Sequence, residues 1–334
     1  MDFNGHVSCP QTVSIFFTVT MAIISSAASI GNILVIAAVY KTPSLRTSAN
    51  IYYVNMAVSD FLASLATWPL YLTDEIITSR GSLIQGPLAT AGCKVGMFVR
   101  LVSSSVSIIS LVLIAVDRFI ATVYPLKITA LTGRKRAVSL FATWLTSIAQ
   151  YIPNIYHSRV ENFGQETYCS FVWNAPAKAI HFIYCMIFII ALLVAIIYLY
   201  LRIMLALRSR LKPESHAAVC KLECRRIKEN QNIMRIFKAI VVAYFVCLFP
   251  LLVFLILKIT YPELFFKDKC KWIVGFCYFV FMSLSAAINP VILFSFSSKF
   301  RNALKTLCPH FRMKCILCRK ETSVSPEQYP PDLI

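Results

Sequence analysis

Seven apolar stretches, each long enough to cross a lipid bilayer, constrain this chain more than any other feature. A membrane-spanning helix needs about 20 mostly apolar residues, because the hydrocarbon core is about 30 Å thick. Only 14% of the residues are charged and 58% are hydrophobic, unlike the composition of a soluble domain. The chain is therefore predicted to be an all-α membrane protein, a bundle of seven transmembrane helices. The predicted spans are residues 12–40, 49–76, 95–123, 137–157, 176–201, 239–259 and 272–297.

The distribution of basic residues predicts how the bundle is oriented. Most of the 33 lysines and arginines fall in the odd-numbered connections and in the tail, and such residues stay on the cytoplasmic side. We therefore expect an extracellular N-terminus, a cytoplasmic C-terminus and a multi-pass protein of the plasma membrane. The net charge of +18 is better explained by attraction to anionic membrane lipids than by nucleic-acid binding.

The chain is expected to form one transmembrane domain with short ends. The extracellular N-terminus is residues 1–11, the transmembrane bundle is 12–297, and the cytoplasmic tail is 308–334. Between bundle and tail, residues 298–307 place Phe300, Leu304 and Leu307 on one face, which predicts a short amphipathic helix on the membrane surface.

Features of the tail suggest two further functions, each with a simpler alternative. Cys308, Cys315 and Cys318 follow the amphipathic helix directly, so they are either acylation sites or free thiols. The C-terminal sequence "PPDLI" either adds a strand to a PDZ groove or is the end of an unstructured tail.

Polar groups at middle depth in the predicted spans indicate a buried site. Asp60, Asn32 and Asn289 lie in three different spans, and such groups in a bilayer are costly unless they serve a function. With Ser107 and Ser285 they are expected to form one network, around waters or a small cation. The alternative is that each of them only makes a contact between helices.

A series of motifs in the expected order carries a family resemblance over nearly the whole chain. The motifs are "GNILV", "NMAVSD", Cys93 with Cys169, "DRF" followed by "YPLK", Trp144, Pro250, "NP" and "KFRNAL". The chain resembles a rhodopsin-like (class A) G-protein-coupled receptor. The resemblance implies an extracellular ligand, a heterotrimeric G protein as partner, an arrestin as a further partner, and no catalytic activity.

The resemblance assigns roles to most of these residues. Four cysteines, Cys9, Cys93, Cys169 and Cys270, are expected outside the cell and allow three pairings. By similarity, Cys93 pairs with Cys169, and Cys9 with Cys270 as in some members of the family. Family members bind sodium at the positions of Asp60, Ser107, Ser285 and Asn289. The residues that match the activation switch are Asp117, Arg118, Tyr244, Leu248, Pro250, Asn289, Pro290 and Leu293.

Several switch positions depart from the family pattern. Leu248 replaces a tryptophan, Tyr244 a phenylalanine, and Leu293 the tyrosine three residues after Pro290. The last change removes a hydroxyl from the network of the active state. In the fifth span the usual proline is missing, so the family's cytoplasmic tyrosine matches either Tyr198 or Tyr200.

Arg100 is the strongest indication of the ligand. It occupies the position at which receptors for biogenic amines have an aspartate, so a carboxylate, a phosphate or an acidic side chain is favoured over a monoamine. Alternatively, Arg100 pairs with Asp74 or Glu75. Ser283 replaces the lysine that binds retinal, so no retinal is expected. The expected pocket residues are Arg100, Ser104, Leu251, Leu252, Leu255, Phe279, Ser283, Asp74 and Lys258.

A peptide suits this mixture of apolar and charged residues best, and a lipid or fatty acid with an anionic head is the alternative. A membrane transporter would also use Asp60 and Asn289, but no internal repeat or broken helix supports it. An enzyme is not expected, because the histidines are scattered and no catalytic motif lies within the spans. No cofactor is expected beyond an allosteric sodium ion at Asp60.

Overall fold

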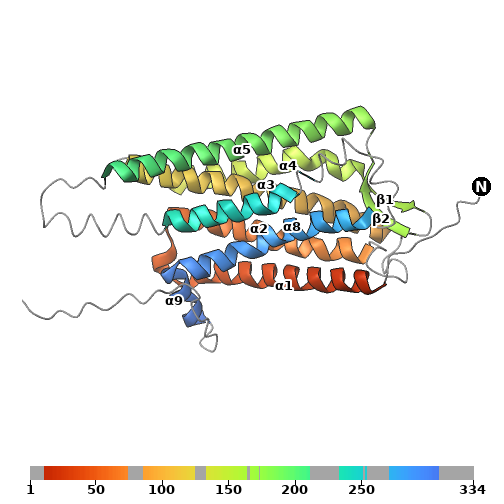
Figure 1. The fold of residues 1–334 in the computed structure, drawn as a ribbon, viewed down its shortest axis with the longest axis horizontal. Coiled ribbons are helices and arrows are strands. Elements are labelled where there is room, and N and C mark those ends of the chain that lie inside the picture. The colour runs from red at the N-terminus through yellow and green to blue at the C-terminus, as the bar shows by residue number, and fades with distance from the viewer. Residues whose placement is uncertain are drawn as a thin grey trace, which may run out of the picture.

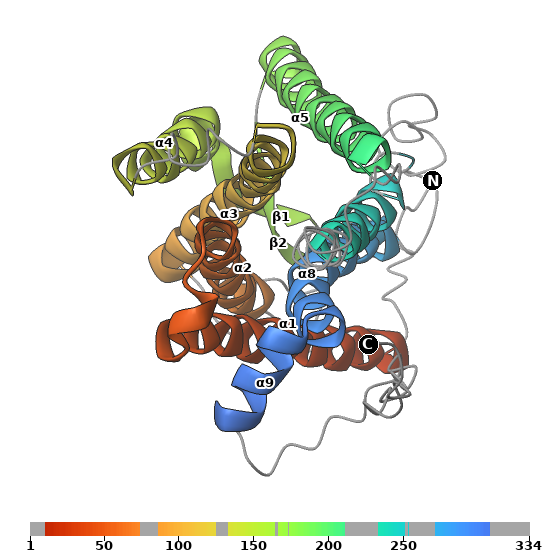
Figure 2. The same cartoon turned by 90° about the vertical axis from the view of Figure 1, so that its left-hand side faces the viewer.

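The computed structural model describes residues 11–73, 86–124, 133–163, 166–172, 174–210, 233–250, 253 and 271–307. Within these ranges seven long helices lie side by side along one axis (Figures 1 and 2). The predicted seven-helix bundle is thereby confirmed. The helices are α1 (Gln11–Lys41), α2 (Ser48–Thr73), α3 (Gly86–Val123), α4 (Gly133–His157), α5 (Ala175–Arg210), the helix Ile233–Pro250, and α8 (Lys271–Phe296).

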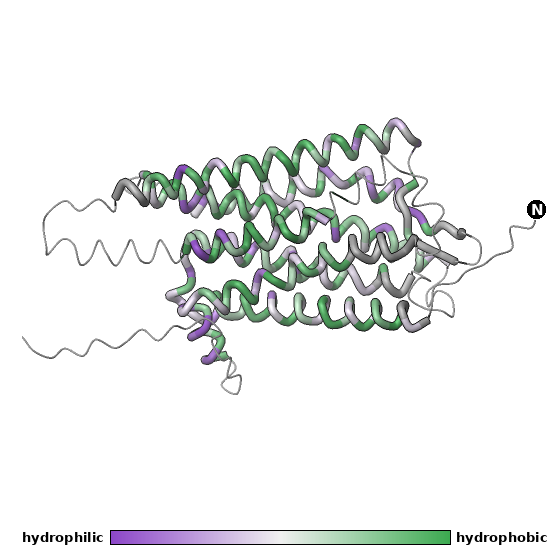
Figure 3. The backbone as a smooth tube through the Cα atoms, viewed as in Figure 1, coloured by the Kyte–Doolittle hydropathy of each residue, from purple (hydrophilic) through white to green (hydrophobic). Residues whose placement is uncertain are grey.

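The outer surface of the bundle is apolar along most of its length (Figure 3). Large side chains such as Phe141 on α4 and Ile187 on α5 are 70% and 62% exposed. In water such a surface would be strongly unfavourable, whereas lipid chains accept it at no cost. Among the described helices, four segments are long and apolar enough on their own to cross a membrane: Ile15–Lys41, Gly86–Val123, Ala179–Ala206 and Ile233–Pro250.

The amphipathic helix expected after the last span is α9 (Ser298–Leu307). It meets the end of α8 at an angle of 100° and packs against α1 (Figure 2). Phe300 and Leu304 are buried, whereas Leu307 is only partly buried. A short 3-10 helix, Pro43–Leu45, connects α1 to α2 at the same end of the bundle.

Two helices begin before the predicted membrane spans, because a helix need not end where the membrane does. The third span was expected from residue 95, but α3 begins at Gly86, whose φ of 69° favours glycine. Pro87 then occupies the first turn, where its missing N–H costs nothing. The sixth helix begins at Ile233 rather than at residue 239.

A two-stranded antiparallel sheet, which the sequence analysis did not predict, covers one end of the bundle (Figure 1). It consists of β1 (Ser158–Phe163) and β2 (Glu166–Phe171), with Val160 opposite Cys169. The predicted disulfide between Cys93 and Cys169 is confirmed, and it ties this hairpin to α3. The second predicted pair, Cys9 with Cys270, lies outside the described residues, as do Cys308, Cys315 and Cys318.

The close approach of α1 to α8 depends on Gly31. A Cβ atom on Gly31 would lie 2.9 Å from Cβ of Pro290, closer than real side chains pack. α8 remains helical through Pro290. Gly31 of the "GNILV" motif therefore makes room for the proline ring and holds the Asn289-Pro290 segment against α1.

Candidate functional site

Asp60 on α2 is the centre of a buried hydrogen-bond network. Its side chain is only 4% exposed. Ser107 Oγ on α3 donates to Asp60 Oδ1 at 2.6 Å, and Asn289 Nδ2 on α8 donates to Oδ2 at 2.8 Å. Ser59 Oγ lies 2.8 Å from Ser107 Oγ and extends the network along α2. Three helices that are distant in sequence thus converge on one carboxylate.

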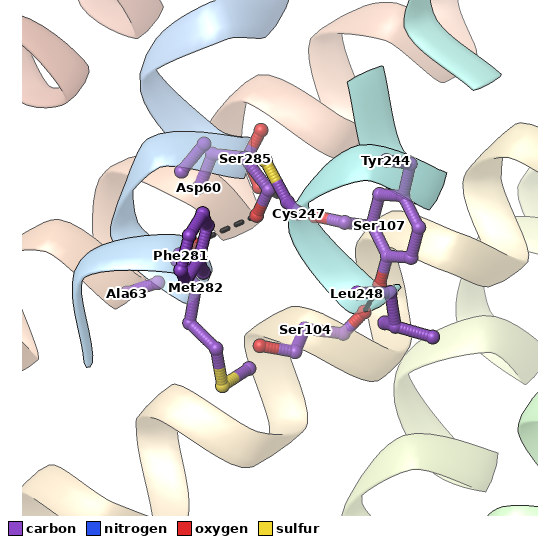
Figure 4. A pocket seen from close by; sticks show the side chains of 11 residues that line it. Asp60, Ala63, Ser104, Ser107, Tyr244, Cys247, Leu248, Phe281, Met282 and Ser285 are labelled. Carbon is purple, nitrogen blue, oxygen red and sulfur yellow. Dashed lines mark hydrogen bonds between the residues drawn. The ribbon is translucent and has the colours of Figure 1, made fainter. Parts of the chain in front are cut away.

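A small cavity adjoins this network (Figure 4). Its volume is about 30 Å³, which is enough to hold at least one water molecule. Its polar lining comes from Asp60, Ser104, Ser107, Tyr244 and Ser285, and Leu248 and Cys247 close it on the side of the helix Ile233–Pro250. Tyr244 Oη donates to the Ser104 carbonyl at 3.5 Å. Carboxylate and hydroxyl oxygens therefore surround a space suited to a small polar occupant.

Two expected members of the network make other contacts. Asn32 Nδ2 donates to the Ala28 carbonyl at 2.8 Å and to the Ala286 carbonyl at 3.2 Å, which links α1 to α8. Ser285 lines the cavity, but its hydroxyl donates to the Met282 carbonyl of its own helix at 2.7 Å. Asn32 is therefore not a member of the Asp60 network. It makes a polar contact between two helices, as the alternative interpretation of the sequence held.

Asp117 and Arg118 form an ion pair at the end of the bundle opposite the hairpin. Arg118 Nη2 and Nε donate to Asp117 Oδ2 at 2.6 and 3.1 Å. The side chain of Arg118 is 15% exposed and that of Asp117 is 5% exposed. Leu293 of α8 is only 1% exposed and belongs to the large apolar cluster that fills this end.

The helix Ile233–Pro250 is packed against α5 at this end. Phe237 is fully buried and stacks on Tyr200, with 6.5 Å between ring centroids. Tyr198 is 55% exposed, and its hydroxyl accepts a hydrogen bond from Arg202. Of the two tyrosines that the sequence left as alternatives, Tyr200 is the one that faces the interior of the bundle.

Arg100 lies between α2 and α3 and is 3% exposed. Its Nη1 donates to Thr67 Oγ1 at 3.1 Å, and Ser104 Oγ donates to the Arg100 carbonyl at 3.0 Å. Ser283 is buried on α8. Arg100 is thus more deeply buried than a residue that lines an open ligand pocket. The other expected pocket residues lie outside the part of the chain described with side chains: Asp74, Leu251, Leu252, Leu255, Lys258 and Phe279.

Sequence reasoning missed a polar link between three helices. Trp144 Nε1 on α4 donates to Asn55 Oδ1 at 2.9 Å, and Asn55 Nδ2 donates to Ser110 Oγ on α3 at 2.9 Å. Asn55 and Asp60 are the two ends of the motif "NMAVSD" on α2. The available signal was Asn55 itself, a side-chain amide within an apolar span, which like Asp60 hydrogen-bonds to a serine of α3.

The fold and these buried groups define an integral membrane helical bundle with a disulfide-tied hairpin at one end and an arginine–aspartate pair at the other. The sequence model of the family described as "7 transmembrane receptor (rhodopsin family)" matches residues 31–293. The chain therefore belongs to the rhodopsin family of seven-transmembrane receptors, as its motifs predicted. As a member of this family, the chain is a multi-pass membrane protein of the receptor class.

Individual relatives are distant. The chain is 24% identical over 315 residues to the allatostatin-A receptor of Bombyx mori, covering 92% of this chain and 84% of that one. It is 24% identical to the melatonin receptor type 1A of Mus musculus, covering 84% and 77%. It is 32% identical to the human neuropeptide FF receptor 1, but over only 46% and 34% of the two chains.

Among solved structures, squid rhodopsin matches with a TM-score of 0.72 at 21% identity. The match covers 92% of this chain and 90% of that chain. At this identity the likeness shows the fold, a seven-helix bundle, and leaves the ligand to be argued from the residues.

Proposed function

We propose that the chain is a receptor that binds a peptide or an anionic small molecule outside the cell and activates a heterotrimeric G protein inside it. The observation that carries the ligand class is Arg100, a guanidinium held 3% exposed between α2 and α3. A buried cation is stabilised by an anionic partner and repels a second cation. The positive charge of Arg100 would attract a carboxylate or phosphate on the ligand and repel a monoamine.

The relatives do not decide the ligand class by themselves, because some are named for neuropeptide FF and others for melatonin. The charge of Arg100 favours a peptide with an acidic side chain or a free carboxylate. A lipid or fatty acid with an anionic head satisfies the same charge and is the second candidate. A transporter is not favoured, since the chain belongs to a receptor family.

The Cys93–Cys169 disulfide supports the orientation of this receptor. Disulfides persist on the oxidising, extracellular side of a membrane. We therefore propose that the end with the hairpin lies outside the plasma membrane and that the end with Asp117, Arg118 and α9 lies in the cytoplasm. That end would meet the G protein and an arrestin, with α9 on the lipid surface. Acylation of the tail and PDZ binding remain predictions.

The network around Asp60 supports a sodium site. Hard cations prefer oxygen ligands, and the carboxylate of Asp60 faces the cavity together with Ser104, Ser107 and Ser285 hydroxyls. These residues fit a small cation in number and chemistry. A sodium ion there would neutralise the buried carboxylate, and it would favour the conformation in which the cavity stays closed. Asp60 is the residue that gives the site its charge.

Replacing Arg100 with methionine is expected to raise the ligand concentration for half-maximal response about thirtyfold or more. The change keeps bulk but leaves the anionic group of the ligand unpaired. The measurement is nucleotide exchange at matched surface expression, with peptides, fatty acids and monoamines tested as separate classes.

Arg136→Met is the matched control, because Arg136 also donates to a hydroxyl, that of Ser48, at the other end of the bundle. It should leave the concentration dependence unchanged. Activation of the wild type by monoamines alone would contradict the proposed ligand class, and activation by fatty acids alone would favour the second candidate.

A further inference from the structure

Tyr53 on α2 carries a buried hydroxyl for which the structure shows no use. The residue is 3% exposed, and among the residues that the structure describes no group hydrogen-bonds to Tyr53 Oη. Its neighbour Tyr52 differs, since Tyr52 Oη lies 3.2 Å from Ser139 Oγ. A buried hydroxyl without a partner is costly, whereas phenylalanine at the same place would be free of that cost.

The surroundings of Tyr53 connect it to the ion pair. Both charges of the Asp117–Arg118 pair act electrostatically on the Tyr53 hydroxyl. Tyr53 also belongs to the same buried cluster as Leu293, at the end where α2, α3 and α8 meet. The unpartnered hydroxyl is thus within electrostatic range of the paired arginine. It shares a buried cluster with Leu293 of α8, a side chain without a hydroxyl.

We propose that Tyr53 is a positioning residue that receives Arg118 when the Asp117–Arg118 pair opens. The Arg118 guanidinium then donates a hydrogen bond to Tyr53 Oη, so α2 supplies the hydroxyl that Leu293 cannot supply from α8. In the closed conformation the hydroxyl has no partner, and in the open one it has a charged donor. The hydrogen bond therefore exists in only one state and shifts the equilibrium towards it. This inference rests on the proposed coupling to a G protein.

The test uses purified full-length receptor in lipid nanodiscs, without added ligand, and a panel of purified G-protein heterotrimers. Tyr53→Phe should lower basal nucleotide exchange about fivefold, because the open state loses one hydrogen bond to a charged group. The same change should raise the melting temperature by about 2 °C, because the closed state loses an unpartnered hydroxyl. The rescue variants below separate a hydrogen bond lost from the open state from a closed state that is merely more stable.

Tyr52→Phe is the matched control. It removes a hydroxyl that has a partner, so it should lower the melting temperature and leave exchange unchanged. Adding Leu293→Tyr to the Tyr53→Phe receptor should restore exchange by returning a hydroxyl to α8, whereas Leu293→Phe, which adds bulk alone, should not.

If the Tyr53→Phe receptor drives nucleotide exchange at the wild-type rate, the inference is wrong. The inference is also wrong if Tyr53→Phe lowers both the exchange rate and the melting temperature. A wild-type receptor that drives no exchange on any heterotrimer, with or without ligands from the library, contradicts the proposed function itself. The two failures are therefore distinguishable.

Discussion

Replacing Cys93 with alanine is expected to lower the stability of the receptor by about 2–5 kcal/mol and to remove most of it from the cell surface. The disulfide joins residues 76 apart in sequence, so its loss frees a long segment of the unfolded chain. It also releases the β1–β2 hairpin from the beginning of α3. The measurements are the melting temperature of the purified receptor and the fraction at the surface.

The partner residue and a free cysteine provide the controls. Cys169→Ala should have the same effect as Cys93→Ala, and the double variant should be no worse than either, because all three remove the same bond. Cys185→Ala should change little, since Cys185 is a half-buried free thiol on α5. A Cys93→Ala receptor with the stability and surface level of the wild type would show that the hairpin is held by other contacts.

Replacing Asp60 with asparagine is expected to abolish the stabilisation of the receptor by sodium ions. The substitution keeps the shape of the side chain and removes the charge that a cation needs in the adjoining cavity. In the wild type, sodium at about ten times its dissociation constant would contribute about 1.4 kcal/mol, or about 3 °C in melting temperature. The measurement compares melting in sodium chloride with melting in choline chloride at equal ionic strength.

Asn32→Ala is the control that separates a loss of sodium-dependent stabilisation from a general loss of stability. Asn32 bonds the backbone carbonyls of Ala28 and Ala286, so its removal should lower the melting temperature equally in both salts. Asp60→Asn should instead give equal melting temperatures in the two salts. If the melting temperature of Asp60→Asn still differed between sodium chloride and choline chloride, the sodium ion would have to bind at another site.

The helices were predictable because apolar length and basic flanks are local properties of the sequence. Residues 12–40 were expected to cross the membrane, and α1 is Gln11–Lys41. The ends of the helices were less predictable. α3 begins at Gly86 and Pro87, outside the apolar stretch, because the backbone preferences of these two residues set the start of the helix and hydropathy does not. The hairpin was missed because its two six-residue strands follow directly on a helix.

The members of the candidate site were predictable, but their partners were not. Asn32 and Asn289 have the same side chain and lie at similar depth, yet only Asn289 donates to Asp60. The rotation of each helix and its distance from α2 decide this, and both depend on contacts such as Gly31 with Pro290. Likewise, Tyr52 and Tyr53 are adjacent in sequence, and only packing gives one of them a partner.

Nucleotide exchange on purified G-protein heterotrimers, measured for the wild type and for Arg118→Ala, tests the central claim most directly. The wild type is expected to accelerate exchange in response to an anionic peptide or small molecule. Arg118→Ala is expected to lose that acceleration while keeping its surface level, because it removes the guanidinium that pairs with Asp117 and that the proposed activation requires. The receptor function would be contradicted if Arg118→Ala left nucleotide exchange unchanged and vesicles that contain the protein showed substrate flux across their membrane.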